Sequence, residues 1–192
     1  MKRIYLLLAL PAMLSLHSCG GGENKGEGEN SDSTNTESAE VDYTGMSEFD
    51  LNPHGLKTTI MVTDIIAENG DPFPVNVVQD RDMLTWDVKV GNEGTEEFYL
   101  VIEEVDGEGN YIAREKERLA NDVVFAEEFI VDEPNLFLYK ASLPEGAGQR
   151  DYFHVFGLVK IGGVEYIAKS FAMGEYSKVQ AEDMLKAIRS IK

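Results

Sequence analysis

The chain has 192 residues, 43% of them hydrophobic, and its formal net charge at pH 7 is −18. An acidic excess of this size repels phosphate. It therefore excludes nucleic-acid binding by phosphate neutralisation and disfavours docking on anionic membranes through a basic face. We interpret the charge as a source of solubility. Cys19 is the one cysteine, so no intrachain disulfide can form and the fold must depend on its hydrophobic core.

Residues 1–18 have the composition of a bacterial export signal. Lys2 and Arg3 give it a positive start, and a mainly apolar stretch follows over residues 4–16. This stretch is shorter than the roughly 20 apolar residues that a membrane-spanning helix needs. The sequence therefore predicts a cleaved leader, whose removal takes away two positive charges and leaves the mature chain near −20.

The leader ends in Leu16-His17-Ser18-Cys19, which resembles the lipobox of bacterial lipoproteins, with His17 as a departure from the usual pattern. The resemblance implies that the Cys19 thiol receives a diacylglyceryl group, that cleavage makes Cys19 the first residue, and that its amine is acylated. Two or more acyl chains would hold the protein on the membrane almost permanently. The alternative is an ordinary secretory signal with a chance cysteine. Against that alternative, the cysteine ends the apolar run and is followed directly by Gly20-Gly21-Gly22.

Residues 19–45 predict a lipidated cysteine followed by a disordered acidic tether. Gly, Ser, Asn, Thr and Glu dominate this segment, a composition that buries too little apolar surface to offset the entropy of ordering. About 25 such residues have a root-mean-square span of roughly 28 Å. Gly20 stands where many inner-membrane lipoproteins have Asp, so the resemblance indicates the outer membrane. The acidic stretch Glu23–Glu29 leaves both the periplasmic face and the cell surface open as locations.

Residues 46–192 carry the patterns of a single domain that is rich in strands. Short stretches alternate between apolar and polar residues, and turn residues separate them. One stretch has apolar residues on both faces, which is typical of a central strand, and Gly162-Gly163 suits the tight turn of a hairpin. The strands expected from these patterns are residues 56–63, 84–90, 97–105, 127–131, 136–142, 152–161 and 164–171.

Two helices are expected, over about residues 113–122 and from Ser177 to the end of the chain. Ser177 and Gln180 have the spacing of a capping box. Glu182 and Lys186 are expected to pair across one turn. An apolar stripe at helical spacing is formed by Ala181, Met184, Leu185, Ile188 and Ile191. Because the stripe needs a sheet to cover, the predicted fold is α+β, a mainly antiparallel β-sheet with the C-terminal helix packed on one face.

The order of these elements resembles the PsbP-like α/β/α sandwich over residues 54–191. The likeness rests on a His54-Gly55-Leu56 start, a long final hairpin ending Tyr166-Ile167-Ala168, and a terminal helix finishing Ile188-Arg189-Ser190-Ile191. Many small exported bacterial lipoproteins share this fold, which hosts assembly factors and binding proteins. The resemblance therefore implies an architecture and no particular activity, and no site residue carries over.

The residue types that carry catalysis form no recognisable constellation. The sequence contains no G-x-S-x-G elbow, no tetrahedral zinc ligand set and no phosphate loop. His54 and His154 are interpreted as structural residues, because a triad would also need a positioned Ser or Cys. Trp86 lies in an alternating apolar stretch and is assigned to the core in preference to sugar stacking.

One acidic turn has part of the spacing of a calcium-binding EF-hand. Asp106, Glu108 and Asn110 fall at its first, third and fifth positions, and Glu117 falls at the twelfth. Tyr111 stands where the sharp turn requires glycine. An ordinary acidic turn leading into a helix is therefore the preferred interpretation.

These patterns predict a lipid-anchored lipoprotein of the outer membrane, with Cys19 as its single assigned site and no cofactor, metal or nucleic-acid partner. Its domain would bind or assemble with an envelope protein without catalysing a reaction. One alternative is an envelope hydrolase with carboxylate-based chemistry, and another is a small-ligand-binding lipoprotein. The hydrolase predicts a cleft containing carboxylates with raised pKa values, whereas an assembly role predicts a large apolar patch.

Overall fold

The computed structural model describes residues 40–107, 109–143 and 150–192; Cys19, the leader and most of the expected tether lie outside this part. The described residues belong to one compact unit that begins at Glu40. Tyr43 packs against the main core, so residues 40–45 belong to the domain although the sequence assigned them to the tether. The elements in chain order are β1 (Met46–Asp50), η1 (Asn52–His54), β2 (Thr59–Thr63), β3 (Asn76–Asp80), β4 (Thr85–Asn92), β5 (Thr95–Glu104), α1 (Tyr111–Ala120), β6 (Ala126–Asp132), β7 (Leu136–Ser142), β8 (Asp151–Ile161), β9 (Val164–Ser170) and α2 (Lys178–Ser190).

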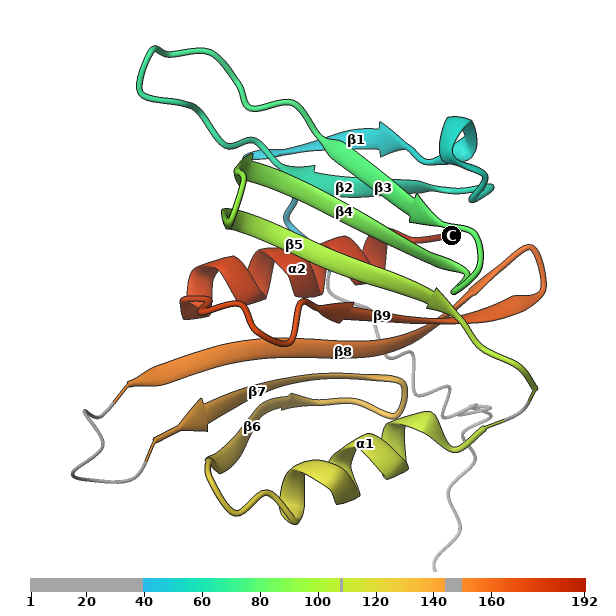
Figure 1. The fold of residues 1–192 in the computed structure, drawn as a ribbon, viewed down its shortest axis with the longest axis vertical. Coiled ribbons are helices and arrows are strands. Elements are labelled where there is room, and N and C mark those ends of the chain that lie inside the picture. Colours follow the sequence, from blue (N-terminus) through green and yellow to red (C-terminus); the bar gives the residue numbers. More distant parts are fainter. Residues whose placement is uncertain (1–39, 108, 144–149) are drawn as a thin grey trace, which may run out of the picture. The chain divides into compact units, whose positions relative to one another are not determined.

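Seven strands form one antiparallel sheet in the order β3-β4-β5-β9-β8-β7-β6, and β1 and β2 form a separate hairpin (Figure 1). The chain builds one half of the sheet from β3 to β5 and then crosses through α1 to the opposite edge. It returns inward through β6, β7, β8 and β9 until β9 pairs with β5. The α+β class with a mainly antiparallel sheet is therefore confirmed.

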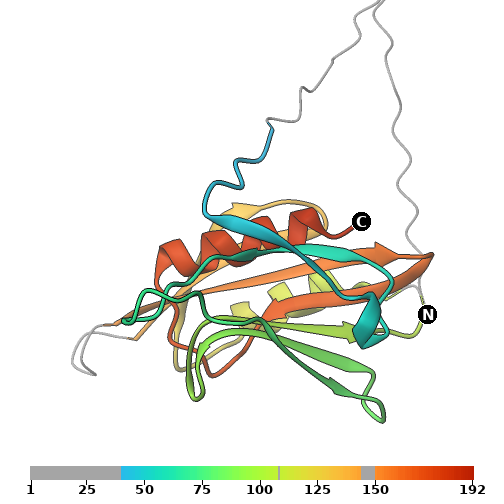
Figure 2. The ribbon, with the colours of Figure 1, turned by 90° about the horizontal axis from the view of Figure 1, so that it is seen from above.

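One face of the sheet, here the α2 face, is covered by α2 and the β1–β2 hairpin (Figure 2). A rung of register partners across five strands illustrates its character, because every member is apolar or glycine. The members are Trp86, Ile102, Ala168, Gly157 and Leu136. The four that have a side chain are buried, so the α2 face holds the main hydrophobic core.

Helix α2 lies close to the sheet because of its stripe and a glycine beneath it. Ser177 and Gln180 form the expected capping box, and the stripe from Ala181 to Ile188 is buried. Ile191, the last residue expected in the stripe, lies just beyond the end of the helix and is half-buried. A Cβ atom on Gly157 would lie 2.8 Å from both Ile188 Cγ2 and Leu136 Cδ1, closer than packed carbons approach. The expected packing of the C-terminal helix on one face is confirmed.

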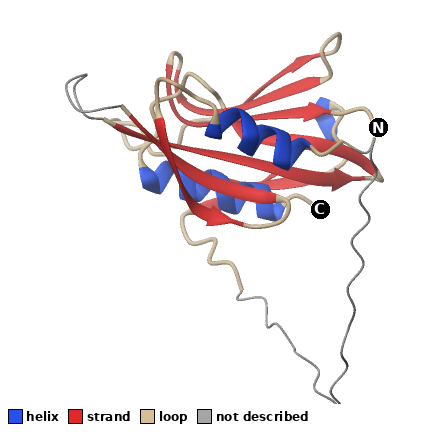
Figure 3. Cartoon of the chain, turned by 90° about the horizontal axis from the view of Figure 1, so that it is seen from below, coloured by secondary structure: helices blue, strands red, loops and turns tan. Residues whose placement is uncertain are grey.

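The opposite face, here the α1 face, is covered by a helix over only part of its width (Figure 3). The rung next to the one above consists of Asp87, Val101, Lys169, Phe156 and Phe137. Phe156 and Phe137 are buried with Ile112 and Leu119 of α1. Asp87 and Lys169 are half-exposed, so this face changes from apolar to polar along a single rung.

Some details of the sequence prediction were wrong. β1 and β3 were not expected, since both are five-residue strands whose side chains are mostly exposed or half-exposed. Leu84 was placed on the apolar face of a strand, but it lies in the β3–β4 turn with φ +51° and is exposed. Helix α1 lies two residues earlier than predicted.

The ion pair expected on α2 was also wrong. Glu182 Oε1 lies 3.6 Å from Lys178 Nζ, and Lys186 Nζ lies 3.1 Å from Asp183 Oδ1. Glu182 and Lys186 therefore each pair with a different residue of α2, four and three positions away.

Candidate functional site

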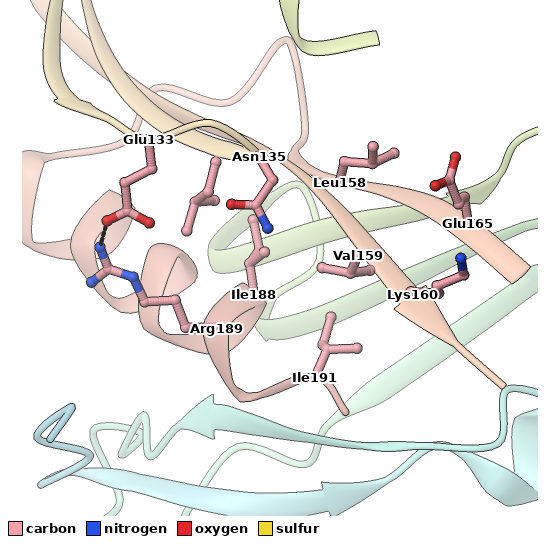
Figure 4. Close-up of a pocket in the computed structure, with 10 residues that line it drawn as sticks. Glu133, Asn135, Leu158, Val159, Lys160, Glu165, Ile188, Arg189 and Ile191 are labelled. Carbon is pink, nitrogen blue, oxygen red and sulfur yellow. Dashed lines mark hydrogen bonds and ion pairs between the residues drawn. The ribbon is translucent and has the colours of Figure 1, made fainter. Parts of the chain in front are cut away.

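Among the hollows on the surface of the described domain, one on each face of the sheet combines apolar and charged lining residues. The first, the α2 hollow, has a volume of about 460 Å³ and is lined by the end of α2, the turn between β6 and β7, and the β8–β9 hairpin (Figure 4). Leu136, Val159 and Ile188 make its apolar floor, and they belong to or pack against the main core. This floor is therefore a shallow exposure of the core.

The charged residues around the α2 hollow are matched with each other. Arg189 forms an ion pair with Glu133 across its mouth (Figure 4). Lys160 and Glu165 are register partners in the β8–β9 hairpin. Two acidic and two basic residues line the α2 hollow, so its charge favours neither a cation nor an anion, and we assign it a structural role.

The second hollow, the α1 trough, has a volume of about 370 Å³. It lies between the C-terminal end of α1 and the segment 172–175, which links β9 to α2. Its floor is a rung of register partners formed by Glu127 of β6, Ala141 of β7 and Tyr152 of β8. The small side chain of Ala141 leaves space between its larger neighbours, which accounts for the depth of the trough.

Aromatic rings form much of the wall of the α1 trough. Phe125 and Tyr152 meet edge to face with ring centroids 6.4 Å apart. Tyr139 stacks on His154 at 5.5 Å. Met173, which is 80% exposed, adds a flexible apolar side chain to the lining. The lining therefore suits a ligand that has an apolar body.

Two charged residues of the α1 trough are engaged within the protein. Arg118 donates to Glu115 through Nε (3.0 Å) and Nη2 (2.7 Å), and this pairing raises the pKa of the Arg118 guanidinium. Asp122 accepts from the backbone N–H groups of Val124 (2.8 Å) and Phe125 (3.1 Å), and these bonds lower the pKa of its carboxyl. Both groups therefore shape the walls of the trough.

Glu127 differs from these residues because part of its carboxylate has no partner. Its Oε2 is buried and accepts no hydrogen bond, the one such side-chain nitrogen or oxygen in the part of the chain that the structure describes. Burial raises the pKa of the Glu127 carboxyl; the charge of Asp122 raises it further, and Arg118 opposes the shift. Buried acceptors are nearly always satisfied, so an orphan oxygen on the floor of a trough indicates where a donor could bind.

His154 lines the same trough and is a neutral structural residue. Its Nδ1 is 3.1 Å from Ser170 Oγ. The same oxygen accepts a hydrogen bond from the N–H of Val155 (3.1 Å). The Ser170 hydroxyl can then donate to Nδ1, which assigns the ring proton to Nε2. Burial lowers the pKa of His154 to about 4. Ser170 is buried and does not line the trough, so this pair does not present a nucleophile to a substrate.

The three carboxylates of the α1 trough lie in different environments. Glu127, Asp122 and Glu175 line it. The pKa is raised at Glu127 and lowered at Asp122, while Glu175 pairs with Arg150 at 3.7 Å. Acid–base hydrolysis needs two carboxyls with complementary roles on either side of a bond. Glu127 and Asp122 have opposite pKa shifts, as an acid and its partner carboxylate would, so the arrangement is compatible with binding and with hydrolysis.

The other residues considered from the sequence lie apart from this trough. Trp86 is in the core, as predicted, and its Nε1 donates to the backbone oxygen of His54 (2.7 Å). The Tyr111 hydroxyl donates to the backbone oxygen of Asp106 (2.9 Å), while Glu108 lies outside the described residues. Within residues 40–107, 109–143 and 150–192, no group of three His, Cys, Asp or Glu side chains could hold a metal ion.

Sequence reasoning missed the α1 trough because its floor depends on the register of three strands. One signal was present: Phe125, Glu127 and Phe129 alternate, which puts an acid on an otherwise aromatic face of a strand. Ala141 carries no signal of its own. Its importance follows only from its position between Glu127 and Tyr152.

Comparison with known proteins adds no relative. No family model, curated protein or solved structure matches the chain. In the described residues, neither helix is long and apolar enough to cross a membrane.

Proposed function

We propose that this protein is a lipid-anchored lipoprotein of the bacterial outer membrane whose domain is a non-enzymatic binding module. The α1 trough is its ligand site, and the unpartnered Oε2 of Glu127 on the trough floor is the observation that carries this proposal. The lipobox-like sequence ending at Cys19 supports the anchor. The acidic segment that follows would give the domain reach from either the periplasmic face or the cell surface.

The anchor is tested by feeding cells an alkyne-labelled fatty acid and comparing the natural protein with a Cys19→Ala variant. We expect label and membrane association in the natural protein and loss of both in the variant. A variant that still fractionates with the outer membrane and carries label would overturn the anchor at this residue.

The binding role is tested by native mass spectrometry of protein released gently from cells, with Ala141→Leu as the matched variant. Leucine adds three carbons to the floor of the trough without adding charge, so we expect it to displace a retained ligand. A cross-linked pull-down through a tag placed after Lys192 separates a protein ligand from a small one. Turnover of a substrate that is lost in Glu127→Gln would replace the binding role with an enzymatic one.

The hydrolase remains the second candidate because the trough contains one carboxyl with a raised pKa, as that alternative predicted. It would use Glu127 as a general acid and would need a second carboxylate to activate water. The PsbP-like relationship is likewise a proposal. A helix on each face of an antiparallel sheet supports it, and it implies no activity.

A further inference from the structure

Glu127 limits the chemistry of the ligand, because an ionised carboxylate only accepts hydrogen bonds. Its buried Oε2 can be satisfied by a group that brings an N–H or O–H to the floor of the trough. A quaternary ammonium lacks such a hydrogen and a carboxylate ligand lacks it too. The ligand must therefore carry a donor at the end that enters the trough.

The charges around the trough select a positive donor. Glu127, Asp122 and Glu175 line it, whereas the guanidinium of Arg118 is already bound in bidentate fashion to Glu115. An alcohol would satisfy the hydrogen bond but leave the carboxylate charge uncompensated in a partly dehydrated site. An ammonium would provide both the donor and the opposite charge, and charge-assisted hydrogen bonds are about twice as strong as neutral ones.

The rest of the lining determines what the ammonium is attached to. Ala141 gives the floor a flat apolar centre, with the ring of Tyr152 as its register neighbour. Tyrosine and phenylalanine rings attract both alkyl chains and nearby cations. Resting on the binding role proposed above, we infer that the α1 trough binds an alkylammonium group, which donates to Glu127 while its carbon chain lies over Ala141. The group can belong to a free amine or to a lysine side chain of an envelope protein.

The probes are three compounds that share a butyl chain and differ in its end group: n-butylammonium, 1-butanol and pentanoate. Binding is followed by saturation-transfer NMR with the complete lipidated protein in nonionic detergent. We expect n-butylammonium to bind about tenfold more tightly than 1-butanol, and pentanoate not to bind measurably. Equal binding of the three probes would overturn the inference.

Glu128 provides a matched control for Glu127. The two residues are neighbours in β6, but Glu128 is the register partner of Lys140 and forms an ion pair with it at 2.5 Å. Glu127→Gln and Glu128→Gln each remove one negative charge. We expect the first to weaken n-butylammonium binding about tenfold and the second to leave it unchanged. Equal effects would show that only net charge matters and would contradict the inference.

Failure of the inference can be told apart from failure of the proposed binding role. If Ala141→Leu abolishes binding of a probe that Glu127→Gln does not affect, the trough is a ligand site of another chemistry. If none of the three probes binds and native mass spectrometry finds no ligand, both fail. A second variant avoids the core: Met173→Lys places a competing ammonium on the exposed lining and should weaken n-butylammonium binding, whereas Val179→Lys, exposed on α2, should not.

The source of the amine is distinguished by treating intact cells with a carbodiimide, which joins a carboxyl to a bound amine as an amide with loss of water. A peptide containing Glu127 linked to a lysine of another protein identifies a protein ligand. The same peptide with the mass of a small amine identifies a free one. An unmodified Glu127 peptide, with Glu128 coupled to Lys140 in the same sample, would contradict occupation by an amine in the cell.

Discussion

The two faces of the sheet use neighbouring residues of the same strands in different ways. On the α2 face, one rung runs from Trp86 to Leu136 through buried apolar side chains and Gly157. On the α1 face, the next rung begins at the half-exposed Asp87 and becomes apolar only beneath α1, at Phe156 and Phe137. The difference indicates that the α2 face provides most of the stability, which leaves the α1 face free to form a binding site.

The largest expected effect on stability comes from two neighbouring residues of β5 whose side chains point to opposite faces of the sheet. Leu100 is fully buried on the α2 face, and Val101 is half-buried on the α1 face. We expect Leu100→Ala to lower the free energy of unfolding by about 2–5 kcal/mol and Val101→Ala to lower it by no more than about 1 kcal/mol. Urea denaturation measures both. Similar losses would show that the two faces share the stability equally.

A second, smaller test concerns the histidine buried on the α1 face. Burial lowers the pKa of His154 to about 4 in the folded state, whereas the unfolded chain protonates it near 6.5. The unfolded state therefore takes up the proton first as the pH falls from 6.5 to 4, and folding loses up to about 1.4 kcal/mol per pH unit in that window. Above pH 7 the effect is absent.

His154→Phe keeps a ring between Tyr139 and Tyr176 but cannot take up a proton. Comparing the pH dependence of its unfolding with that of the natural chain isolates the histidine from the many carboxylates. We expect the variant to be flatter between pH 6.5 and 4. Parallel curves would mean that His154 protonates equally well in the folded domain.

A third test addresses the close packing of α2. The Cβ of Gly157→Ala would press against Ile188 and Leu136, both held within the core. Overpacking of this kind costs about 1–3 kcal/mol. The double variant Gly157→Ala with Ile188→Leu removes the Cγ2 methyl group that the new Cβ would meet and should recover part of the loss. Additive losses in denaturation would show that the two side chains do not meet.

How far the sequence predicts this molecule depends on the range of the interactions. The capping box of Ser177 and Gln180 and the stripe on α2 are local patterns, and both are confirmed. The pairing of β5 with β9 is not local, because it joins segments that are separated by α1 and three further strands. The Glu127–Ala141–Tyr152 rung is harder still to predict, since it depends on two hairpin registers and on a bulge in β6.

Local patterns also fail where several outcomes are close in energy. On α2, Lys186 has both Asp183 and Glu182 within reach, and exposed pairs of this kind differ by only a few tenths of a kcal/mol. The sequence alone does not predict which of these two acids pairs with Lys186. Leu84 fails for a different reason, since the Asp80 carboxylate accepts from the N–H groups of Asp82 and Met83 and forms a turn where alternation predicted a strand.

The smallest expected effect separates binding from stability at one residue. The pKa of Glu127 is raised in the folded domain, chiefly by burial, so the folded state holds its proton to a higher pH than the unfolded chain does. Its contribution to stability is therefore favourable at low pH and is lost as the pH rises through the raised pKa. At pH 7, Glu127→Gln should raise the stability of the domain slightly, within the small range usual for a partly exposed site, and it should have no such effect below pH 4. Thermal unfolding at the two pH values measures this, with Glu128→Gln as control.

A residue whose replacement strengthens the fold and weakens ligand binding is one retained for binding. A loss of stability at pH 7 would instead assign Glu127 a structural role.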